Sequence, residues 1–482
     1  TGVQTCALPI LKTLYYILLL LAAHLYWCVS QSELSTVWLS SGHWEQLSML
    51  YRRAVAAFNH NGVLNGQECD QYDDYYGNHT QYIRESVKDT AMPHFGNEKK
   101  LFSELIQYNH SAVSQQCSSA TDILSFLHSN MKSLTVPCGK DRLFSHCQLH
   151  YLFSINLEKQ KCSSYTREPF IGEDAQIGVT LTTQMSFNRF DRLPYLLKRW
   201  KGPMSIGVFV MPEEYPAFVD FISHYMGLPI TLCVYIPLGL ENTSYYIRRN
   251  QFKQYFTKTL YPMNLLRDLA IESITTSHFM YVDADFMTSD TVPNAIKENQ
   301  ELLRDENVIL LFTTFQFTGK APHFPECRKN GINCTLIWDS LPLNKTTLRD
   351  GVTKGLLLPI GSMFHNITNI QEWIKVNSSK VYETQVKPNL EPYIIMRRSP
   401  LNPIFHPYYI EYGYDKTEFF RRLYAYNRFK YYVLPLDFGI DIPHKQSNSS
   451  KSFARNGKED IMRELRYHSN EFLHKYTNVS FK

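Results

Sequence analysis

The chain has 482 residues, with 49 Lys and Arg against 45 Asp and Glu, so its formal net charge is only +4. Hydrophobic residues make up 44% and charged residues 20%, a composition that excludes disordered, collagen-like and coiled-coil proteins. The small net charge, with no long basic run, argues against a dedicated nucleic-acid binder. The length allows roughly two to four domains, or one large catalytic domain with an accessory region.

An apolar segment near the amino terminus, residues 13–29, is at the short end of the length that spans a membrane. Lys12 precedes it and no Lys or Arg follows until Arg52, so the positive-inside rule places the rest of the chain in the lumen. We predict a single-pass type II signal anchor; a signal peptide cleaved near Ser30 is the alternative. Residues 1–12 would be a short cytoplasmic tail, and the first ten of them resemble a sequencing or gene-prediction artefact.

Two further features agree with a luminal location. Glycosylation sequons occur more often than chance supplies. They lie at Asn78, Asn109, Asn242, Asn333, Asn344, Asn366, Asn377, Asn448 and Asn478. The cysteines beyond the anchor are even in number, as disulfides require, and their spacing does not fit zinc. Five of them lie within 69–162, where we expect disulfides, and Cys327 with Cys334 could close a short loop.

The pattern of the chain changes near residue 171. Residues 30–170 are irregular and predict a luminal stem with a disulfide-bearing accessory region. Beyond them, predicted strands alternate with predicted helices, which indicates an α/β fold with a mostly parallel, doubly wound sheet in a catalytic domain at 171–482. We expect strands at 177–183, 205–211, 230–236, 278–286 and 307–315, and helices at 190–200, 217–225 and 261–275. Ligands of such sheets bind beyond the carboxyl ends of the strands.

Two acidic residues, Asp283 and Asp285, follow the apolar strand run 279–282. Asp is disfavoured inside strands, so both side chains should project from the strand end. Two carboxylates one residue apart can hold Mn²⁺ or Mg²⁺ while leaving positions open for diphosphate oxygens. Such a cation stabilises the charge on a departing nucleoside diphosphate. A solvated turn without a ligand is the alternative.

Several sequence blocks surround this motif in a fixed order. They are 179–186, 196–210, 261–270, 281–286, 391–400, 411–416 and 433–444. Over roughly residues 175–446 the chain resembles glycosyltransferase family 49, which includes a glucuronyltransferase of dystroglycan O-mannose glycans and the second catalytic domain of LARGE-type enzymes. The resemblance implies a GT-A-type fold and a Mn²⁺-dependent inverting transferase with a UDP-sugar donor, UDP-glucuronate first.

The resemblance assigns metal ligands residue by residue. Asp283 and Asp285 match the family's metal-binding DxD motif. Late in the chain, Asp441 stands where the family has a His, and His444 matches a second His of the LARGE-type pattern. Residues three apart in an extended segment point to opposite faces, so we expect one late ligand rather than two, with a preference for His444; a bend at Pro443, which would change the directions, is the alternative. The segment 405–409 departs from the family's acidic pattern, which points to a rebuilt acceptor side.

The remaining candidates concern the donor and the acceptor. Residues that could contact a diphosphate or a glucuronate carboxylate lie at strand ends or on the helix before the motif; an ordinary structural position is the alternative for each. They are Thr182, Thr183, Gln184, Arg267, Asp268, Arg397 and Arg398. Glu391, Glu411 and Asp415 are candidates for the general base that takes the acceptor's proton. His365 is expected to be an ordinary loop histidine.

These observations predict a Golgi type II membrane glycosyltransferase that moves a sugar from a UDP-sugar to a hydroxyl of a glycan or glycoprotein. Within the same chemistry, UDP-N-acetylglucosamine and UDP-xylose are alternative donors. The alternative of another class is a non-catalytic luminal protein on the same scaffold that binds a glycan or a partner transferase. A complex with another glycosyltransferase is compatible with either alternative.

Overall fold

The structure is a computed structural model that describes part of the chain. The described residues are 99, 102–103, 113–131, 139–140, 144–147, 150–172, 175–237, 244–249, 252–254, 261–360, 365–407, 409 and 413–445. All of them belong to one compact unit, Phe95–Val479. The predicted membrane segment and amino-terminal tail lie outside the described residues. Among those described, no helix combines the length and the apolar character needed to span a bilayer.

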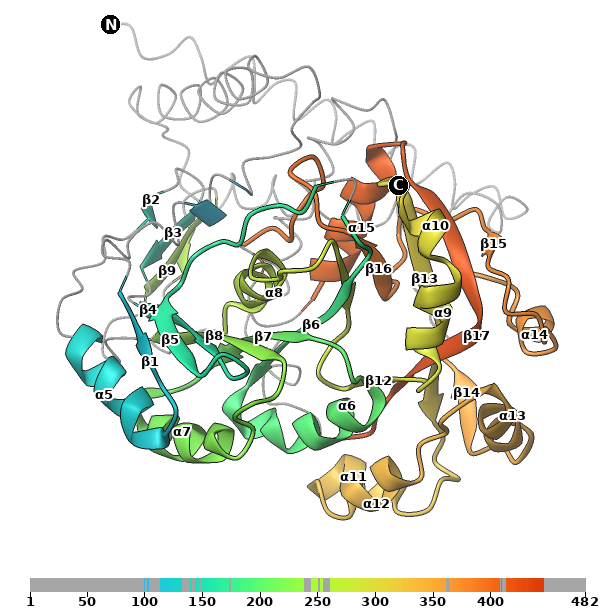
Figure 1. The fold of residues 1–482 in the computed structure, drawn as a ribbon. Helices are drawn as coiled ribbons and strands as arrows, with labels where there is room; N and C mark the ends of the chain where they lie inside the picture. The colour runs from blue at the N-terminus through green and yellow to red at the C-terminus, as the bar shows by residue number, and fades with distance from the viewer. Residues whose placement is uncertain are drawn as a thin grey trace, which may run out of the picture. The chain divides into compact units, whose positions relative to one another are not determined.

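Four parallel strands form the centre of the large sheet. Their spatial order is β8 (Ile230–Pro237), β7 (Met204–Phe209), β6 (Val179–Ser186) and β11 (His278–Tyr281) (Figure 1). Of these four strands, β6 comes first in the chain; the chain then continues outward through β7 to β8 and returns to the other side of β6 to form β11. The strand order therefore reverses between β6 and β11. In doubly wound sheets this is the point where ligands bind, beyond the carboxyl ends of the strands.

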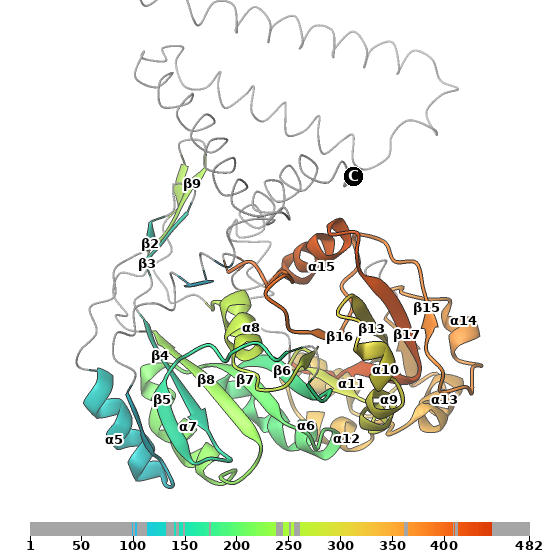
Figure 2. The same cartoon turned by 45° about the horizontal axis from the view of Figure 1, so that its top comes forward.

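Helices cover both faces of these central strands. The helices α6 (Leu193–Arg199) and α7 (Tyr215–Ser223) lie on one face, and α8 (Met263–Glu272) lies on the other (Figures 1 and 2). The backbone of α8 comes directly against β7 at Gly207, where a Cβ atom would lie 2.0 Å from the carbonyl oxygen of Leu266. Every residue of α8 is consequently buried.

The predicted elements of the central region are confirmed, with shifts of a few residues. The predicted helix at 190–200 begins earlier, as the 3-10 turn η1 (Phe187–Arg192). The predicted strand at 278–286 is two strands, because the acidic turn separates β11 from β12 (Phe286–Thr288). The last predicted strand is β13 (Val308–Phe317).

The strands flanking the centre pair mostly antiparallel. On the β8 side, the next strands in order are β4 (His150–Asn156), β5 (Lys161–Ser164) and β1 (Ser114–Gln116). On the β11 side, they are β16 (Ile394–Arg397), β13, β17 (Lys430–Asp441) and β12. Two short strands pair outside this order, β14 (Leu357–Pro359) with β13 and β15 (Tyr382–Glu383) with β17. Only four of the twelve pairings described in this sheet are parallel. The sheet is mixed, so the prediction of a mostly parallel sheet is wrong outside its centre. Short connections such as the 157–160 turn between β4 and β5 permit only antiparallel pairing.

The remaining elements lie at the edges of this sheet or in its connections. A second sheet has the order β10 (Phe252–Gln254), β9 (Ser244–Arg249), β3 (Phe144–Cys147), β2 (Gly139–Lys140). The other helices are α5 (Ala120–Met131), η2 (Pro212–Glu214), α9 (Val292–Glu298), α10 (Gln300–Leu303), α11 (Phe324–Asn330), α12 (Cys334–Asp339), α13 (Lys345–Thr353), α14 (Ile370–Trp373) and α15 (Asp415–Ala425).

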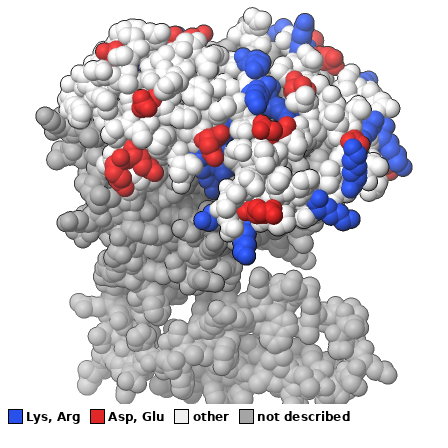
Figure 3. Space-filling view, turned by 90° about the horizontal axis from the view of Figure 1, so that it is seen from below, with Lys and Arg blue, Asp and Glu red and all other residues white. Residues whose placement is uncertain are grey.

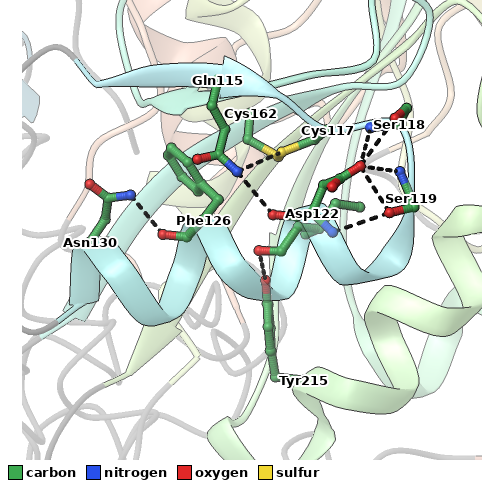
Figure 4. Close-up of a disulfide and its surroundings, with 10 residues drawn as sticks. Gln115, Cys117, Ser118, Ser119, Asp122, Phe126, Asn130, Cys162 and Tyr215 are labelled. Atoms are coloured by element: carbon green, nitrogen blue, oxygen red, sulfur yellow. Dashed lines mark hydrogen bonds between the residues drawn. A yellow bond between two sulfur atoms is a disulfide. The ribbon is translucent and has the colours of Figure 1, made fainter.

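Part of the predicted accessory region extends the central sheet, since β1, β4 and β5 belong to it. The disulfide Cys117–Cys162 joins the end of β1 to β5. Beside it, Asp122 accepts hydrogen bonds from the backbone N–H groups of Ser118 and Ser119 at the start of α5 (Figure 4). The predicted short loop is closed by a disulfide between Cys327 and Cys334. Cys233 is buried and forms no disulfide, so not all eight cysteines that follow residue 29 pair.

The described surface carries mixed charges and some exposed apolar side chains. On the face seen in Figure 3, basic and acidic side chains are interspersed among uncharged ones. Ile332, Leu336 and Leu343 expose 49–55% of their surface. These three residues are close in sequence to the exposed sequon residues Asn333 and Asn344.

Candidate active site at the acidic turn

The acidic motif forms a turn at the carboxyl end of β11. The backbone N–H of Val282 donates to the carbonyl of Thr182 across 3.1 Å, so the ladder with β6 continues up to the motif. The N–H of Phe286 then donates to the carbonyl of Asp283 across 2.9 Å and closes the turn before β12. Asp283 and Asp285 therefore lie at the reversal of strand order between β6 and β11.

Asp283 is surrounded by hydrogen-bond donors. Its Oδ1 accepts from Tyr281 and from Nη2 of Arg267 at 3.1 Å, and its Oδ2 accepts from Lys416 Nζ at 2.8 Å and Tyr393 at 3.0 Å. Burial alone would raise the pKa of Asp283, but Lys416 and Arg267 hold it well below its ordinary value. Four donors use about all the acceptor positions of an ionised carboxylate. This residue is thus tied into the protein.

Arg267 connects three parts of the site. It projects from α8, only 2% of its side chain is exposed, and it pairs with Asp283 and with Asp415 at the start of α15. Its guanidinium lies 5.2 Å from the ring centre of Tyr281 and 5.0 Å from that of Phe405. Asp415, a predicted general base, is consequently buried in an ion pair with Arg267.

Asp285 has different neighbours. It forms ion pairs with Arg189 and with Nε of Arg192 at 2.8 Å, and Nε2 of His444 lies 3.3 Å from its Oδ2. Both arginines belong to η1, which follows the carboxyl end of β6. Neither arginine was among the residues predicted from the sequence, although their position directly after the first predicted strand was a usable signal.

The last described strand brings the late candidates to this turn. Asp441 lies opposite Phe286 in the β12–β17 ladder. Burial, together with the charge of Asp285, raises the pKa of Asp441 to about 7. His444 contacts Asp285 and the charge of Asp285 acts on Asp441, so both late residues lie near this carboxylate, and the expectation of one late ligand stays a prediction. The strand β17 ends at Asp441, the N–H of Ile442 still donates to the carbonyl of Asp285, and the chain leaves the ladder at Pro443, which has no N–H.

These residues fit a divalent cation in kind. Two carboxylates and an imidazole, from Asp285, Asp441 and His444, are donors that Mn²⁺ accepts. The like charges of Asp285 and Asp441 also favour a cation between them. No three Asp, Glu, His or Cys side chains within the described ranges are already gathered as a metal site, however. A cation that binds Asp285 would have to compete with its ion pairs to Arg189 and Arg192.

The donor-side candidates 182–184 lie beside the acidic turn but within β6, which continues to Ser186 rather than ending at them. Thr182 donates its hydroxyl to the carbonyl of Met280 at 3.3 Å, Gln184 accepts from Tyr261, and Thr183 is fully buried. Asp268 instead holds a neighbouring segment of the chain in place. Its Oδ1 accepts the backbone N–H of Phe405 at 2.8 Å, which attaches the 405–409 segment to α8.

The structure does not bring Arg397 and Arg398 to the site. Arg397 lies opposite His278, at the amino end of β11, whereas the acidic turn follows the carboxyl end. Both arginines donate to backbone carbonyls of the 168–172 segment, and Arg398 also pairs with Glu272. The prediction that they contact the donor is therefore not supported by their position, because an apolar strand before an arginine does not reveal its direction in the sheet.

Two other candidates have separate outcomes. Glu411 lies outside the described residues, and Glu391 accepts a hydrogen bond from Thr417. His365, expected to be an ordinary loop residue, stacks beside Tyr393 with ring centres 6.4 Å apart. Burial, with the nearby charge of Lys416, lowers the pKa of His365 to about 4. Lys416 and Tyr393 were also missed as site residues, although Lys416 is in one of the family-like blocks.

Comparisons with known proteins identify relatives. The profile of a family described as "Glycosyl-transferase for dystroglycan" matches residues 178–230 and 238–477. Xylosyl- and glucuronyltransferase LARGE1 of Mus musculus is 24% identical over 284 residues, which cover 58% of this chain and 33% of that protein. Glycosyltransferase-like protein LARGE of Caenorhabditis elegans is 25% identical over 281 residues, covering 57% and 39%. The match thus spans about a third of the length of these relatives.

Among solved structures, the chain is similar to S. aureus TarS residues 1–349 in complex with UDP-GlcNAc. The sequence identity is 12%, the TM-score is 0.33, and the match covers 62% of this chain and 71% of that one. The same fragment in complex with UDP has 12% identity, a TM-score of 0.29 and coverages of 62% and 70%.

Proposed function

The chain belongs to the glycosyltransferase family described for dystroglycan, and from this premise we propose that it transfers a sugar, glucuronate first, from a UDP-sugar to a glycan hydroxyl with inversion. Glucuronate is chosen over other sugars because the relatives are named xylosyl- and glucuronyltransferases. UDP-xylose is accordingly the second donor to test, and UDP-N-acetylglucosamine the third.

The observation that carries this proposal is the contact of His444 Nε2 with Oδ2 of Asp285 at 3.3 Å, with Asp441 in the ladder opposite Phe286, at the reversal of strand order. Two distant parts of the chain thus converge where a doubly wound sheet binds its ligand. A solvated turn would not require this convergence. The buried ion pair of Arg267 with Asp283 and Asp415 also favours a built site, since burying charges is costly without such partners.

We assign separate tasks to the two acids of the motif. Asp285, with Asp441 and His444, would hold Mn²⁺ or Mg²⁺, which supplies positive charge to the departing diphosphate when bound. Asp283 would position the turn, because its oxygens already accept from Tyr281, Tyr393, Lys416 and Arg267. Thr182 and Gln184 lie within the neighbouring strand β6, beside the acidic turn, where we expect the nucleotide.

The acceptor hydroxyl must lose a proton to a base. Asp415 is held in the buried ion pair with Arg267, so we place it last of the three candidates. We propose Glu391 as the general base, in preference to Glu411. Glu391 is part-buried and lies just before β16. Replacing Glu391 with Gln should lower kcat while leaving the affinity for UDP unchanged.

The proposed setting is the Golgi lumen, with the amino-terminal segment as a type II anchor. The described disulfides Cys117–Cys162 and Cys327–Cys334 support an oxidising compartment. The acceptor would then be a glycan or glycoprotein, and association with another glycosyltransferase belongs to the same proposal. The non-catalytic alternative is favoured by two departures from the family pattern, Asp441 in place of a His and the altered segment 405–409.

A donor screen tests the proposal. The luminal chain is incubated with Mn²⁺ and each of UDP-glucuronate, UDP-xylose and UDP-N-acetylglucosamine, with and without EDTA, and release of UDP is measured. The proposal expects EDTA-sensitive release, fastest with UDP-glucuronate. Glycan binding that EDTA leaves unchanged, with no UDP released from any donor, would support the non-catalytic alternative.

A further inference from the structure

Two arginines bind the same carboxylate, Asp285, but they are held differently. Arg192 exposes 7% of its side chain, packs 5.7 Å from the ring centre of Trp338, and contacts Oδ1 of Asp285 through Nε. Arg189 exposes 29% of its side chain and contacts Oδ2 through Nη1. Arg192 is therefore fixed by its surroundings, whereas Arg189 reaches Asp285 from a partly solvated position.

The oxygen that Arg189 contacts is also the one nearest the late residues. His444 Nε2 lies 3.3 Å from this same Oδ2 of Asp285. The guanidinium of Arg189 consequently supplies positive charge on the side of Asp285 that His444 approaches, next to the end of β17 where Asp441 lies. A divalent cation held by those residues would compete with Arg189 for that oxygen.

We infer that Arg189 is a placeholder cation: it neutralises Asp285 in the empty enzyme, and it moves to the donor's diphosphate when metal and donor bind. This inference rests on the proposed function, since it assumes a diphosphate ligand. Solvent reaches the guanidinium of Arg189 more than that of Arg192, so its ion pair with Asp285 is the better screened of the two and the easier to exchange. The guanidinium has a planar fork of donors that matches phosphate oxygens as well as carboxylate oxygens.

The two roles of Arg189 predict opposite effects of one substitution. Without Arg189, metal binding no longer displaces a cation, so Mn²⁺ should bind the empty protein more tightly. Without Arg189, the diphosphate loses a ligand, so UDP should bind more weakly when Mn²⁺ is present. A residue with a merely structural role would move both affinities in the same direction or neither.

The experiment measures binding rather than turnover. Mn²⁺ affinity is measured by electron paramagnetic resonance without nucleotide, and UDP affinity by calorimetry at saturating Mn²⁺, for the wild-type chain and for Arg189→Gln. We expect Mn²⁺ to bind about three- to tenfold more tightly to the variant, and UDP about tenfold more weakly. Arg189→Lys, which keeps the charge but not the fork, should leave the Mn²⁺ affinity near wild type and still weaken UDP binding.

Arg304→Gln is the matched control, because Arg304 is half exposed and its ion pair is with Glu301. It should change neither affinity. An unchanged or weaker Mn²⁺ affinity in Arg189→Gln overturns the placeholder role, and unchanged UDP affinity overturns the transfer to the donor. If the wild-type chain itself binds neither Mn²⁺ nor UDP, the proposed function fails first and the inference fails with it, so the two failures are distinguishable.

Discussion

The backbone N–H of Ile442 donates a hydrogen bond to the carbonyl oxygen of Asp285 across 2.8 Å. This bond continues the ladder in which Phe286 lies opposite Asp441, and it fixes the end of β17 against the acidic turn. The geometry at Asp285 consequently depends on a strand that lies more than a hundred residues later in the chain.

Gly439 tests this dependence. A Cβ atom at position 439 would lie 1.7 Å from the ring of Phe286, which is itself stacked on Tyr393 with ring centres 3.6 Å apart. Since neither ring can move freely, Gly439→Ala should destabilise the protein by roughly 1–3 kcal/mol and shift the turn at Asp285. Urea denaturation and UDP affinity measure the two effects. Gly319→Ala is the control, because a Cβ there meets nothing within 4 Å; equal behaviour of the two variants would contradict the packing argument.

Asp285→Ala should abolish transfer while the protein stays folded. The expected loss of activity is at least about a hundredfold, since the carboxylate acts on charge in the transition state. Turnover is measured at saturating Mn²⁺, with circular dichroism to check the fold. Asp350→Ala, at an exposed residue paired with Lys354, should retain full activity. Ordinary turnover of Asp285→Ala would remove this residue from the proposed metal site.

The late ligand can be identified from the Mn²⁺ requirement. Asp441→Ala and His444→Ala are each compared with wild type for the Mn²⁺ concentration that gives half-maximal activity. Removing a ligand should raise this concentration by about tenfold or more. Because both side chains interact with Asp285, we now expect both variants to respond, rather than one alone. If both leave the Mn²⁺ dependence unchanged, the 440–444 segment does not take part in metal binding.

The sequence predicted the elements of this site better than their directions. The apolar run before Asp283 indicated a buried strand end, and the helical spacing of Leu265, Leu266 and Leu269 predicted α8. Arg397 also followed an apolar run, but β16 is antiparallel to β11, so its end is at the opposite edge of the sheet. Strand direction depends on long-range pairing, which periodicity does not contain.

The partners of the acidic residues were also hidden from the sequence. Lys416 and Tyr393 reach Asp283 from segments more than a hundred residues later. Arg189 lies closer in sequence, just after a predicted strand, and the rule that ligands bind at carboxyl ends was sufficient to nominate it. The contacts of Lys416 and Tyr393 with Asp283 can be found only once the fold is known. Arg189 could have been found by including the residues just after the predicted strand among the candidates.

His278 predicts a loss of stability in acid. It is fully buried, its Nε2 donates to the carbonyl of Leu303 at 3.0 Å, and its Nδ1 lies 2.9 Å from the hydroxyl of Ser277. Burial, with the charge of Arg397, lowers its pKa to about 4. The unfolded chain takes up a proton near pH 6.5 while the native state does not, so stability is lost as the pH falls from about 6.5 towards 4.

Urea denaturation at pH 7 and pH 5 measures this loss. We expect the contribution of His278 to be about 1–2 kcal/mol over this interval. His278→Gln, which retains a donor for Leu303, should reduce the difference between the two pH values. His224→Gln, at an exposed position, should leave it unchanged. A pH dependence that is the same in His278→Gln and wild type would assign the acid sensitivity to other groups.

Asn-linked glycans on the described sequons follow from the proposed luminal location. Asn333, Asn344, Asn366 and Asn377 are all exposed, and PNGase F should shift the mass of the chain expressed in eukaryotic cells. Glycans at Asn333 and Asn344 would cover the exposed apolar residues Ile332 and Leu343, so the deglycosylated protein should aggregate faster in light scattering.

Asn344 allows the effect of the glycan to be separated from that of the side chain. Its Oδ1 accepts the backbone N–H of Thr347 at 3.1 Å and caps α13. Asn344→Ala removes both the glycan and the cap, and should cost about 1 kcal/mol more in stability than Thr346→Ala, which removes only the sequon. Both variants should lose the same mass of glycan. If Thr346→Ala leaves the mass unchanged, Asn344 carries no glycan, and if no sequon is occupied at all, the predicted topology of the chain is reversed.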